Sequence, residues 1–504
     1  MKSRAVRAGA VAAVALMAAG AVIFAGQSAP ASSQSNSQPT GRPAPDPAAK
    51  TYATYCNGCH GSSLSGGRAP TLLDDEWRFG GGDAEMRQSI TEGRPGTEMP
   101  PFKSVLSEAE ITDMIRYVRA LAVRARTSAA RAQRPAGQIV TSEQHAFKLE
   151  VVVEGLTSPW AIAFLPDGRM LVTERSGALR TIEKGVLQPK AIEGTPAVWT
   201  QQDGGLFDVE VDPAYARNGW IYLSYAEAGP TDSSMTVIVR GRIKQGKWVD
   251  QQVLYRAPEA GYWASNTHYG SRFIFDRQGH LFYSIGDRGR DVDAQDLSKV
   301  NGKVHRINAD GSVPRDNPFA GRAGAQASIW SYGHRNPQGL AFHPVTGRLW
   351  EAEHGPTGGD EVNRIEPGHN YGWPLVHFGM PPVTPPASSS AASASAVTMD
   401  PPVVHWTPSI APSGIAFYTG DKFPKWKNHL FVTGLGGEAL RRLETDGDRV
   451  VHQEAVFSGY GRVRDIVTGP DGYLYVALNV PGVRLSDTTP GLIVRLVPAE
   501  ATQD

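Results

Sequence analysis

The chain has 504 residues, more than one domain usually holds, so its length predicts two or more domains. Its 40% hydrophobic and 20% charged residues are ordinary for a soluble globular protein and exclude wholesale disorder. The formal net charge is zero, which argues against a nucleic-acid partner held by phosphate neutralisation.

The N-terminal segment has the pattern of an export signal. Lys2, Arg4 and Arg7 form a positive start, and an apolar run follows to about Gly26. Residues 1–29 are therefore predicted to be a signal peptide, which places the rest of the chain in a periplasm. The run is long enough that an uncleaved membrane anchor stays open as an alternative. Residues 30–46, rich in Ser, Ala and Pro, are predicted to form a flexible tether.

A C-x-x-C-H motif opens the next segment, residues 47–126. Cys56 and Cys59 can bind the two vinyl groups of one porphyrin, and His60 then ligates the iron. The alternatives are a redox dithiol or half of a zinc site. Zinc would need two further ligands at similar spacing, and the chain has no other cysteine. The motif therefore predicts covalently attached haem c.

The sixth iron ligand is predicted to be Met99, in the proline-stiffened loop Gly96–Pro101. Met86 is the competitor, but its surroundings are typical of a helix in which methionine packs in a core. Further on, Ser107 and Glu110 form the pattern of a capping box before an apolar helix. The whole segment resembles the small class I-type cytochromes c. Residues 127–143 are polar and are predicted to be a linker.

Residues 144–500 change in character to short alternating strands with Asp-Gly and Asn-Gly turns, and the 55 glycines of the chain fit many turns. A strand–turn–strand pattern recurs six times, at Trp160–Thr173, Leu206–Tyr225, Arg272–Ile285, Gln338–Glu351, Gly414–Val432 and Val463–Leu478. One four-stranded sheet per repeat predicts an all-β six-bladed propeller, and a pair of β-sandwiches is the alternative. The predicted fold is thus a propeller with a small N-terminal α-helical cytochrome c domain. The Ser/Ala-rich run 385–397 is predicted to be a surface loop.

Several motifs in this region resemble the soluble aldose sugar dehydrogenases that depend on pyrroloquinoline quinone (PQQ), also called glucose/sorbosone dehydrogenase-like propellers. The similarity covers residues 148–498 almost end to end. It rests on Thr267-His268-Tyr269-Gly270-Ser271-Arg272, Ser331-Tyr332-Gly333-His334-Arg335-Asn336-Pro337-Gln338-Gly339, Glu353-His354-Gly355-Pro356, Asn370-Tyr371-Gly372-Trp373-Pro374 and Arg462-Val463-Arg464-Asp465.

A PQQ site needs several guanidinium groups, because PQQ carries three carboxylates and Arg pairs with carboxylate through two hydrogen bonds. Arg335, Arg462 and Arg464 are predicted to supply them, with Asn336 as a neutral donor. Arg462 and Arg464 stand two apart in a strand and should face the same way. A shared anionic ligand explains them better than two unrelated ion pairs.

The resemblance also implies the catalytic base and the calcium ligands. His268 corresponds to the base of the family, a role that suits an imidazole whose unperturbed pKa is near neutral. Calcium is expected beside the quinone at the main-chain carbonyls of Gly355 and Pro356. A second calcium of related proteins maps to Glu361 and the carbonyl of Tyr371.

Three positions depart from the family pattern. Gln202 and Asp203 align ambiguously with a common Gln, with Asp203 nominally in its place. Ser409 stands where some relatives have Thr, and 434–437 lacks a lysine that contacts the quinone in many relatives. PQQ binding should survive these departures, whereas the substrate preference can have moved.

The sequence thus predicts an exported quinohaemoprotein that oxidises aldoses, or related hemiacetals or alcohols, and passes electrons to its own haem. A downstream one-electron acceptor, such as a soluble cytochrome, an oxidase or the quinone pool, would then receive them. Two alternatives remain: a calcium-dependent lactonase-like hydrolase, which the paired arginines disfavour, and a non-catalytic binding propeller, which His268 disfavours.

Overall fold

The structure is a computed structural model. It describes residues 47–60, 64, 69, 72, 77–95, 97, 99–127, 135, 137–356, 358–379, 399–479 and 490–500. The predicted signal peptide 1–29, the tether 30–46 and the loop 385–397 lie outside the described residues. No helix among the described residues is long and apolar enough to cross a bilayer.

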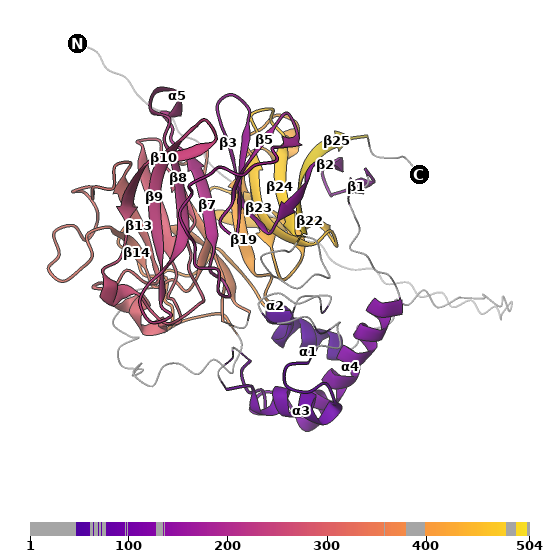
Figure 1. The fold of residues 1–504 in the computed structure, drawn as a ribbon. Helices are drawn as coiled ribbons and strands as arrows, with labels where there is room; N and C mark the ends of the chain where they lie inside the picture. Colours follow the sequence, from indigo (N-terminus) through magenta and orange to yellow (C-terminus); the bar gives the residue numbers. More distant parts are fainter. Residues whose placement is uncertain are drawn as a thin grey trace, which may run out of the picture. The chain divides into compact units, whose positions relative to one another are not determined.

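The N-terminal domain is helical, as predicted (Figure 1). Its helices are α1 (Pro47–Tyr55), α2 (Asn57–His60), α3 (Asp83–Glu92) and α4 (Glu108–Thr127). The predicted capping box begins α4: the Ser107 N–H donates to the Glu110 carboxylate at 2.8 Å, and the Glu110 N–H donates to Ser107 Oγ at 3.3 Å. The helices enclose one apolar cluster, formed by Tyr52, Leu64, Met86, Phe102, Leu106, Ile111, Met114, Ile115, Val118 and Ala122.

The described residues from 139 to 499 form six antiparallel sheets, the blades of the predicted propeller. Blades 1 to 3 contain β3 (Pro159–Phe164), β4 (Met170–Glu174), β5 (Leu179–Glu183) and β6 (Val186–Leu187); β7 (Leu206–Val211), β8 (Ile221–Ala228), β9 (Ser234–Lys244) and β10 (Lys247–Tyr255); and β11 (Phe273–Phe275), β12 (His280–Ile285), β13 (Lys303–Asn308) and β14 (Ile329–Tyr332). Blades 4 and 5 contain β15 (Pro337–Phe342), β16 (Leu349–Glu353), β17 (Asp360–Ile365) and β18 (Val404–Trp406); and β19 (Pro412–Phe417), β20 (Leu430–Gly434), β21 (Ala439–Asp446) and β22 (Arg449–Ser458). Short helices α5 (Tyr215–Asn218), η1 (Glu259–Gly261), η2 (Asp291–Gln295) and η3 (Pro424–Trp426) lie in the connections.

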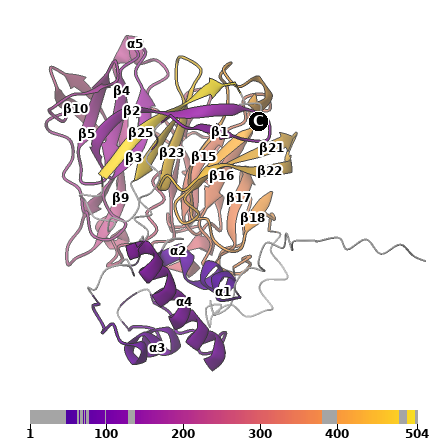
Figure 2. The same cartoon turned by 90° about the vertical axis from the view of Figure 1, so that its right-hand side faces the viewer.

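The sixth blade closes the ring by combining both ends of this region (Figure 2). It contains β23 (Arg462–Thr468), β24 (Leu474–Asn479) and β25 (Pro490–Ala499), followed by β2 (Ala146–Thr157) and β1 (Ile139–Thr141). The β2–β25 ladder runs from Ala146↔Ala499 to Thr157↔Pro490. Strand β1 falls within 127–143, the range predicted to be a linker, so part of that range belongs to the propeller sheet.

Each of the six sequence repeats covers the first two strands of one blade, which confirms the six-bladed fold. These inner strands are buried on both faces, as in the BBBBB pattern of β4, β16 and β20. An apolar cluster fills each space between neighbouring blades; one example joins Leu171 of blade 1 to Val237 of blade 2. Six such clusters close the ring without a gap, so the propeller core is continuous.

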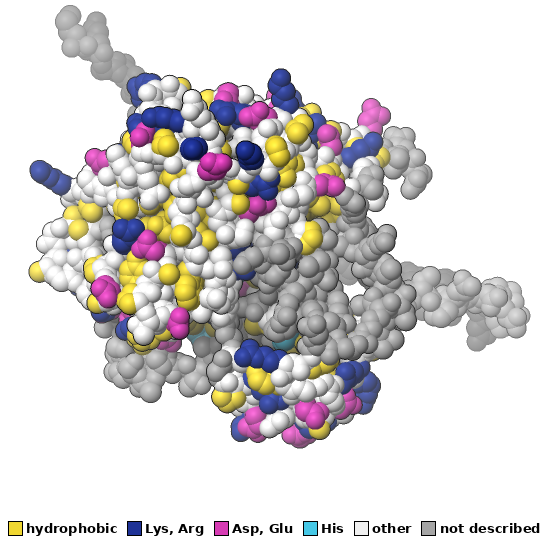
Figure 3. All heavy atoms as spheres, viewed as in Figure 1, with side chains coloured by type: hydrophobic (Ala, Val, Ile, Leu, Met, Phe, Trp, Pro, Cys, Tyr) yellow, Lys and Arg dark blue, Asp and Glu magenta, His cyan; other side chains and the backbone are white. Residues whose placement is uncertain are grey.

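This topology brings the polar motifs to one end of the propeller. In an antiparallel blade, the start of the first strand, the end of the second and the start of the third share one end. His268, Arg335 and Arg462 precede or begin first strands, and Glu353 ends a second strand. We call this end the mouth. The outer surface in Figure 3 carries interspersed positive and negative side chains, in keeping with the zero net charge.

Candidate functional site

Of the predicted haem-attachment residues, Cys59 and His60 lie on the single turn of α2, and Cys56 directly precedes it. The Cys56 N–H donates to the Tyr52 carbonyl at 2.9 Å and the His60 N–H donates to the Cys56 carbonyl at 2.9 Å. This continues the turn of α1 through the motif. Neither thiol is in a disulfide, and burial, with the nearby Cys59, raises the pKa of Cys56 to about 12. Two cysteines without a disulfide and a histidine, close together along the chain, fit covalent haem attachment.

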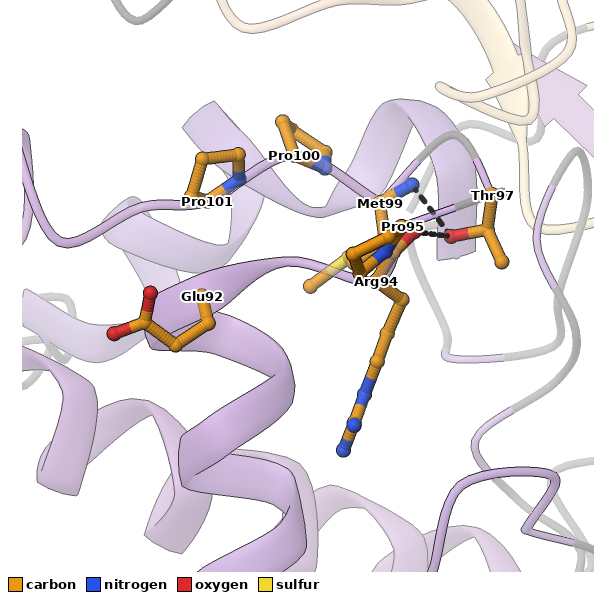
Figure 4. A pocket seen from close by; sticks show the side chains of 7 residues that line it. All are labelled: Glu92, Arg94, Pro95, Thr97, Met99, Pro100 and Pro101. Atoms are coloured by element: carbon orange, nitrogen blue, oxygen red, sulfur yellow. Dashed lines mark hydrogen bonds between the residues drawn. The ribbon is translucent and has the colours of Figure 1, made fainter.

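Met99 lies in a loop that folds back over the end of α3 (Figure 4). The Thr97 hydroxyl donates to the Arg94 carbonyl at 2.7 Å and accepts from the Met99 N–H at 3.2 Å. Gly93, with φ +67°, lets the loop pass closely, since a Cβ there would lie 2.6 Å from the Met99 carbonyl oxygen. The thioether packs at the edge of the helical cluster, whereas Met86 is inside it with 6% of its surface exposed.

His268 is held at the mouth by a buried carboxylate. Its Nδ1 lies 2.6 Å from Asp287 Oδ1, and the other Asp287 oxygen accepts from Trp373 Nε1 at 2.8 Å. Burial by itself raises the pKa of Asp287, but the His268 imidazole and Arg335 outweigh it and bring this pKa below its ordinary value. The ionised carboxylate orients the ring and leaves Nε2 as the nitrogen that can exchange a proton with a ligand. The left-handed backbone of His268, φ +52°, is uncommon for a residue with a side chain.

Several guanidinium groups gather beside this histidine, and the negative groups that act on them include Asp203 and Glu438. Burial, with Arg462, Arg272 and Arg175 nearby, lowers the pKa of Arg464 to about 9. The Nε atoms of Arg462 and Arg464 are buried and have no hydrogen-bond partner within the described residues. A β-bulge between Val463 and Asp465 interrupts the strand, yet the two guanidinium groups still act on each other. An anionic ligand fits these orphaned donors.

Arg335 also lies close to the His268–Asp287 pair, because its main-chain carbonyl accepts from the Asp287 N–H at 2.8 Å. Its NH1 donates to the His354 carbonyl at 3.2 Å, and its guanidinium lies 5.4 Å from the centre of the Trp373 ring. Asn336 Oδ1 accepts from the Gly270 N–H and from Gln338 Nε2, both at 3.1 Å. The predicted donor Asn336 thus uses its oxygen to fasten the turn that follows His268.

The two residues that aligned ambiguously differ in their surroundings. Asp203 Oδ2 accepts from the His268 N–H at 3.4 Å, so this carboxylate belongs to the mouth. Gln202 is exposed, and its carbonyl accepts from Arg175. The side chain that faces the site is therefore that of Asp203.

Asp360 organises the region predicted to hold calcium near the quinone. Its Oδ1 accepts from the Gly355 N–H at 2.9 Å, and its Oδ2 accepts from Ser409 Oγ at 2.7 Å. A Cβ on Gly355 would lie 2.3 Å from the Gly358 carbonyl oxygen, so the Gly355–Pro356 loop is tightly folded. Ser409, a predicted site residue, therefore binds the carboxylate of Asp360, which was not predicted.

Three buried carboxylates meet beside the predicted second calcium site. Asn363 Nδ2 lies 3.1, 3.3 and 3.2 Å from oxygens of Glu351, Glu353 and Glu361. Burial, together with Glu353, raises the pKa of Glu361 well above its ordinary value. Glu351 Oε1 has no hydrogen-bond partner within the described residues. A bound cation would favour the ionised form of these crowded carboxyl groups, and the Tyr371 ring is close, stacked on His334 with 4.8 Å between the ring centres.

Sequence reasoning missed Asp287, Trp373 as a donor, and Asp360. Asp287 follows an apolar strand, where aspartate is usually a turn residue, and its contact with His268 spans 19 positions. Trp373 reaches Asp287 across 86 positions. No periodicity encodes such contacts, although a buried acidic residue directly after a strand in the Gly-Asp-Arg-Gly run was an available signal.

Comparison with known families gives two matches. The family Glucose / Sorbosone dehydrogenase matches residues 156–485, and the family Cytochrome C oxidase, cbb3-type, subunit III matches residues 43–118. The two matches coincide with the propeller and with the helical domain.

Individual proteins resemble the propeller. Aldose sugar dehydrogenase YliI of Escherichia coli is 39% identical over 354 residues, which cover 69% of this chain and 92% of that protein. Quinoprotein glucose dehydrogenase B of Acinetobacter calcoaceticus is 28% identical, with coverage of 68% and 88%. The structure of the PQQ-bound aldose sugar dehydrogenase of Streptomyces coelicolor superposes with a TM-score of 0.57 at 26% identity, covering 72% of this chain and 99% of that one.

Proposed function

Because the chain belongs to the glucose/sorbosone dehydrogenase family and is an oxidoreductase with a cytochrome c domain, we propose that it is an exported quinohaemoprotein. It oxidises aldose sugars, or related hemiacetals or alcohols, with PQQ and transfers the electrons to its own haem. The observation that carries the proposal is the group of buried arginines beside the His268–Asp287 pair, in which the Nε atoms of Arg462 and Arg464 have no hydrogen-bond partner among the described residues.

The arginines bind PQQ in this proposal. Arg335, Arg462 and Arg464 pair with its carboxylates, and Asn336 is a neutral contact. The buried Nε atoms of Arg462 and Arg464 then gain the partners that the described part of the chain does not give them. Asp203, close to both His268 and these arginines, takes the place of the usual glutamine and bears on substrate preference.

His268 is the general base. It removes the proton of the anomeric hydroxyl while the C1 hydrogen leaves with its electron pair, so the aldose becomes a lactone. Asp287 stabilises the imidazolium that forms, and Trp373 holds Asp287 in place. PQQ, when bound, supplies the ortho-quinone that accepts the two electrons.

Calcium is proposed at the main-chain carbonyls of Gly355 and Pro356, where it would polarise the accepting carbonyl of the quinone. Asp360 holds this loop through the Gly355 N–H. A second calcium is proposed at Glu361 and the carbonyl of Tyr371, next to the cluster of buried carboxylates. Hard oxygen donors with excess negative charge are the ligands that calcium prefers.

In the helical domain, Cys56 and Cys59 attach haem c, and His60 and Met99 ligate its iron. A haem accepts one electron at a time and so provides an outlet for a two-electron oxidation. An external one-electron acceptor then receives the electrons.

The test uses the full chain loaded with PQQ and calcium, mixed with an aldose in a stopped-flow spectrometer. We expect haem reduction with a first-order rate that does not change when the protein is diluted tenfold. His268→Gln should slow it by about 100-fold or more while PQQ affinity is retained. His452→Gln, which alters a histidine on the outer strand β22, is the matched control. A rate proportional to protein concentration, or full activity in His268→Gln, would contradict the proposal.

A further inference from the structure

A buried arginine, Arg272, lies at the axis of the propeller. The first strands of the six blades contact one another in a ring, so they surround this axis. Arg272 directly precedes β11, the first strand of blade 3, and 6% of its surface is exposed. Its contacts lie on the first strands of four other blades: Trp160 in β3, Asp208 in β7, Gln338 in β15 and Asp465 in β23. Arg272 therefore connects five of the six blades.

Two buried aspartates share one nitrogen of Arg272. Its NH1 lies 3.2 Å from Asp208 Oδ1 and 3.1 Å from Asp465 Oδ1. The second oxygen of each aspartate accepts from a main-chain N–H of the next blade, at 2.8 and 2.9 Å. Both aspartates are 3% exposed, so a negative charge on either depends on these contacts.

This sharing bears on Arg464, which pairs with a PQQ carboxylate in the proposed function. Asp465 follows Arg464 directly in the chain, yet the Nε of Arg464 has no hydrogen-bond partner within the described residues. Both Arg272 and Arg464 lie over the Trp160 ring, at 4.3 and 5.8 Å from its centre. Burial raises the pKa of Asp465, and both guanidinium groups oppose that shift, Arg272 more than Arg464. The carboxylate next to Arg464 is thus bound by another arginine.

We infer that Arg272 is a positioning residue for PQQ, because it binds Asp465 and so keeps this carboxylate from pairing with Arg464. The inference rests on the proposed function and concerns how the same site is kept ready for an anionic cofactor. Without Arg272, the Asp465 carboxylate is buried and uncompensated, and Arg464 is the neighbouring cation that can pair with it. That pair would neutralise a guanidinium that PQQ needs.

The test measures the Kd of PQQ for the full chain with calcium present, by equilibrium titration at about pH 8.5. Arg272→Met should weaken PQQ binding by about tenfold or more, the loss of one charge-assisted pair. Adding Asp465→Asn should return the Kd to within about threefold of the wild type, because the competing charge is gone. Arg272→Lys keeps the positive charge and should retain most of the affinity.

The pH dependence distinguishes this role from a purely structural one. As the pH falls from about 8.5 to about 6, the loss of affinity in Arg272→Met relative to the wild type should shrink, because the unpaired Asp465 carboxyl takes up a proton and no longer attracts Arg464. Other charged groups titrate in both proteins, so the ratio of the two Kd values at each pH removes their effect. The groups that face the two arginines are Asp208 and Glu210 from β7, Asp465 and Arg462 from β23, Arg175 after β4, and Asp203 before β7.

Arg306→Met is the matched control. Arg306 is also 6% exposed and lies 4.4 Å from the centre of a tryptophan ring, that of Trp330. It binds Asp316 at 2.5 Å, but it is in β13, the third strand of blade 3, and not in a first strand. Thermal unfolding should show that both Met variants are destabilised, whereas the Kd of PQQ should change only in Arg272→Met.

Equal PQQ affinity in Arg272→Met and the wild type at both pH values, or a loss that Asp465→Asn deepens, would overturn the inference. If Arg272→Met does not fold, Asp465→Asn alone decides: a Kd within about threefold of the wild type supports the inference, and a tenfold loss would mean that Arg464 depends on this carboxylate and would refute it. A wild type that binds no PQQ would refute the proposed function itself, and this inference with it.

Discussion

The helical domain and the propeller differ in what holds each of them together. The described helices share one apolar cluster, and Cys56 and Met99 lie at its edge. The propeller has an apolar cluster between every pair of neighbouring blades and closes its ring through β2 and β25. Small domains bury little surface of their own and often depend on a bound group for stability. A haem is therefore expected to be part of the core of the first domain, whereas the proposed PQQ would only fill the mouth of a complete second domain.

The largest expected effect comes from removing the haem. Cys56→Ala combined with Cys59→Ala should abolish covalent haem, so that no haem survives acid-acetone extraction in the polypeptide. The helical domain should then lose protection from limited proteolysis, because part of its core is missing. Dye-linked sugar oxidation by the propeller should persist as the internal control. Covalent haem in the double variant, or zinc in the wild type, would refute the motif interpretation.

A smaller effect should distinguish the two methionines of this domain. Met99→Ala should convert low-spin iron into a high-spin or mis-ligated form and lower its potential, because a thioether ligand raises the potential. Met86→Ala should leave the spectrum nearly unchanged and instead lower the free energy of unfolding, since Met86 is buried in the cluster. Visible spectra and redox titration measure both variants. The opposite pattern would make Met86 the ligand.

The difference between the domains also explains what the sequence could predict. All six blades followed from alternating apolar runs, because the inner strands are buried and encode their own pattern. The strand β2, which completes the last blade, was not identified, since the β2–β25 pairing joins residues more than 300 positions apart. The haem residues follow from one short motif. The groups that orient the others, Asp287 and Asp360, were not identified, because they act through contacts between loops that no periodicity encodes.

In the propeller, the expected effect of removing one PQQ contact is graded. Arg462→Ala should weaken PQQ binding by about 10- to 100-fold, the loss of one charge-assisted pair. Turnover at saturating PQQ should change less, because His268 and Asp287 remain. Equilibrium titration with PQQ measures the affinity, and Arg169→Ala, which breaks an exposed ion pair with Asp167, is the control. Unchanged PQQ affinity in Arg462→Ala would contradict the assigned role.

The smallest expected effect is the contribution of Asp287 to stability in acid. His268 and Arg335 hold the pKa of Asp287 below its ordinary value of 3.8 despite burial. A carboxyl whose pKa is depressed by folding stabilises the native state above its unfolded pKa, and the stabilisation disappears as pH falls through the folded value. Each unit by which folding lowers a pKa corresponds to about 1.4 kcal/mol of free energy of unfolding. When the pH is lowered from 5 to about 2, the free energy of unfolding should therefore fall less in Asp287→Asn than in the wild type.

Tryptophan fluorescence during urea denaturation measures this free energy of unfolding for the propeller, because Trp77 is the one tryptophan of 11 that precedes the propeller. A steeper acid loss in the variant would mean that Asp287 is protonated in the folded protein, and the orientation of His268 by an ionised carboxylate would then be wrong.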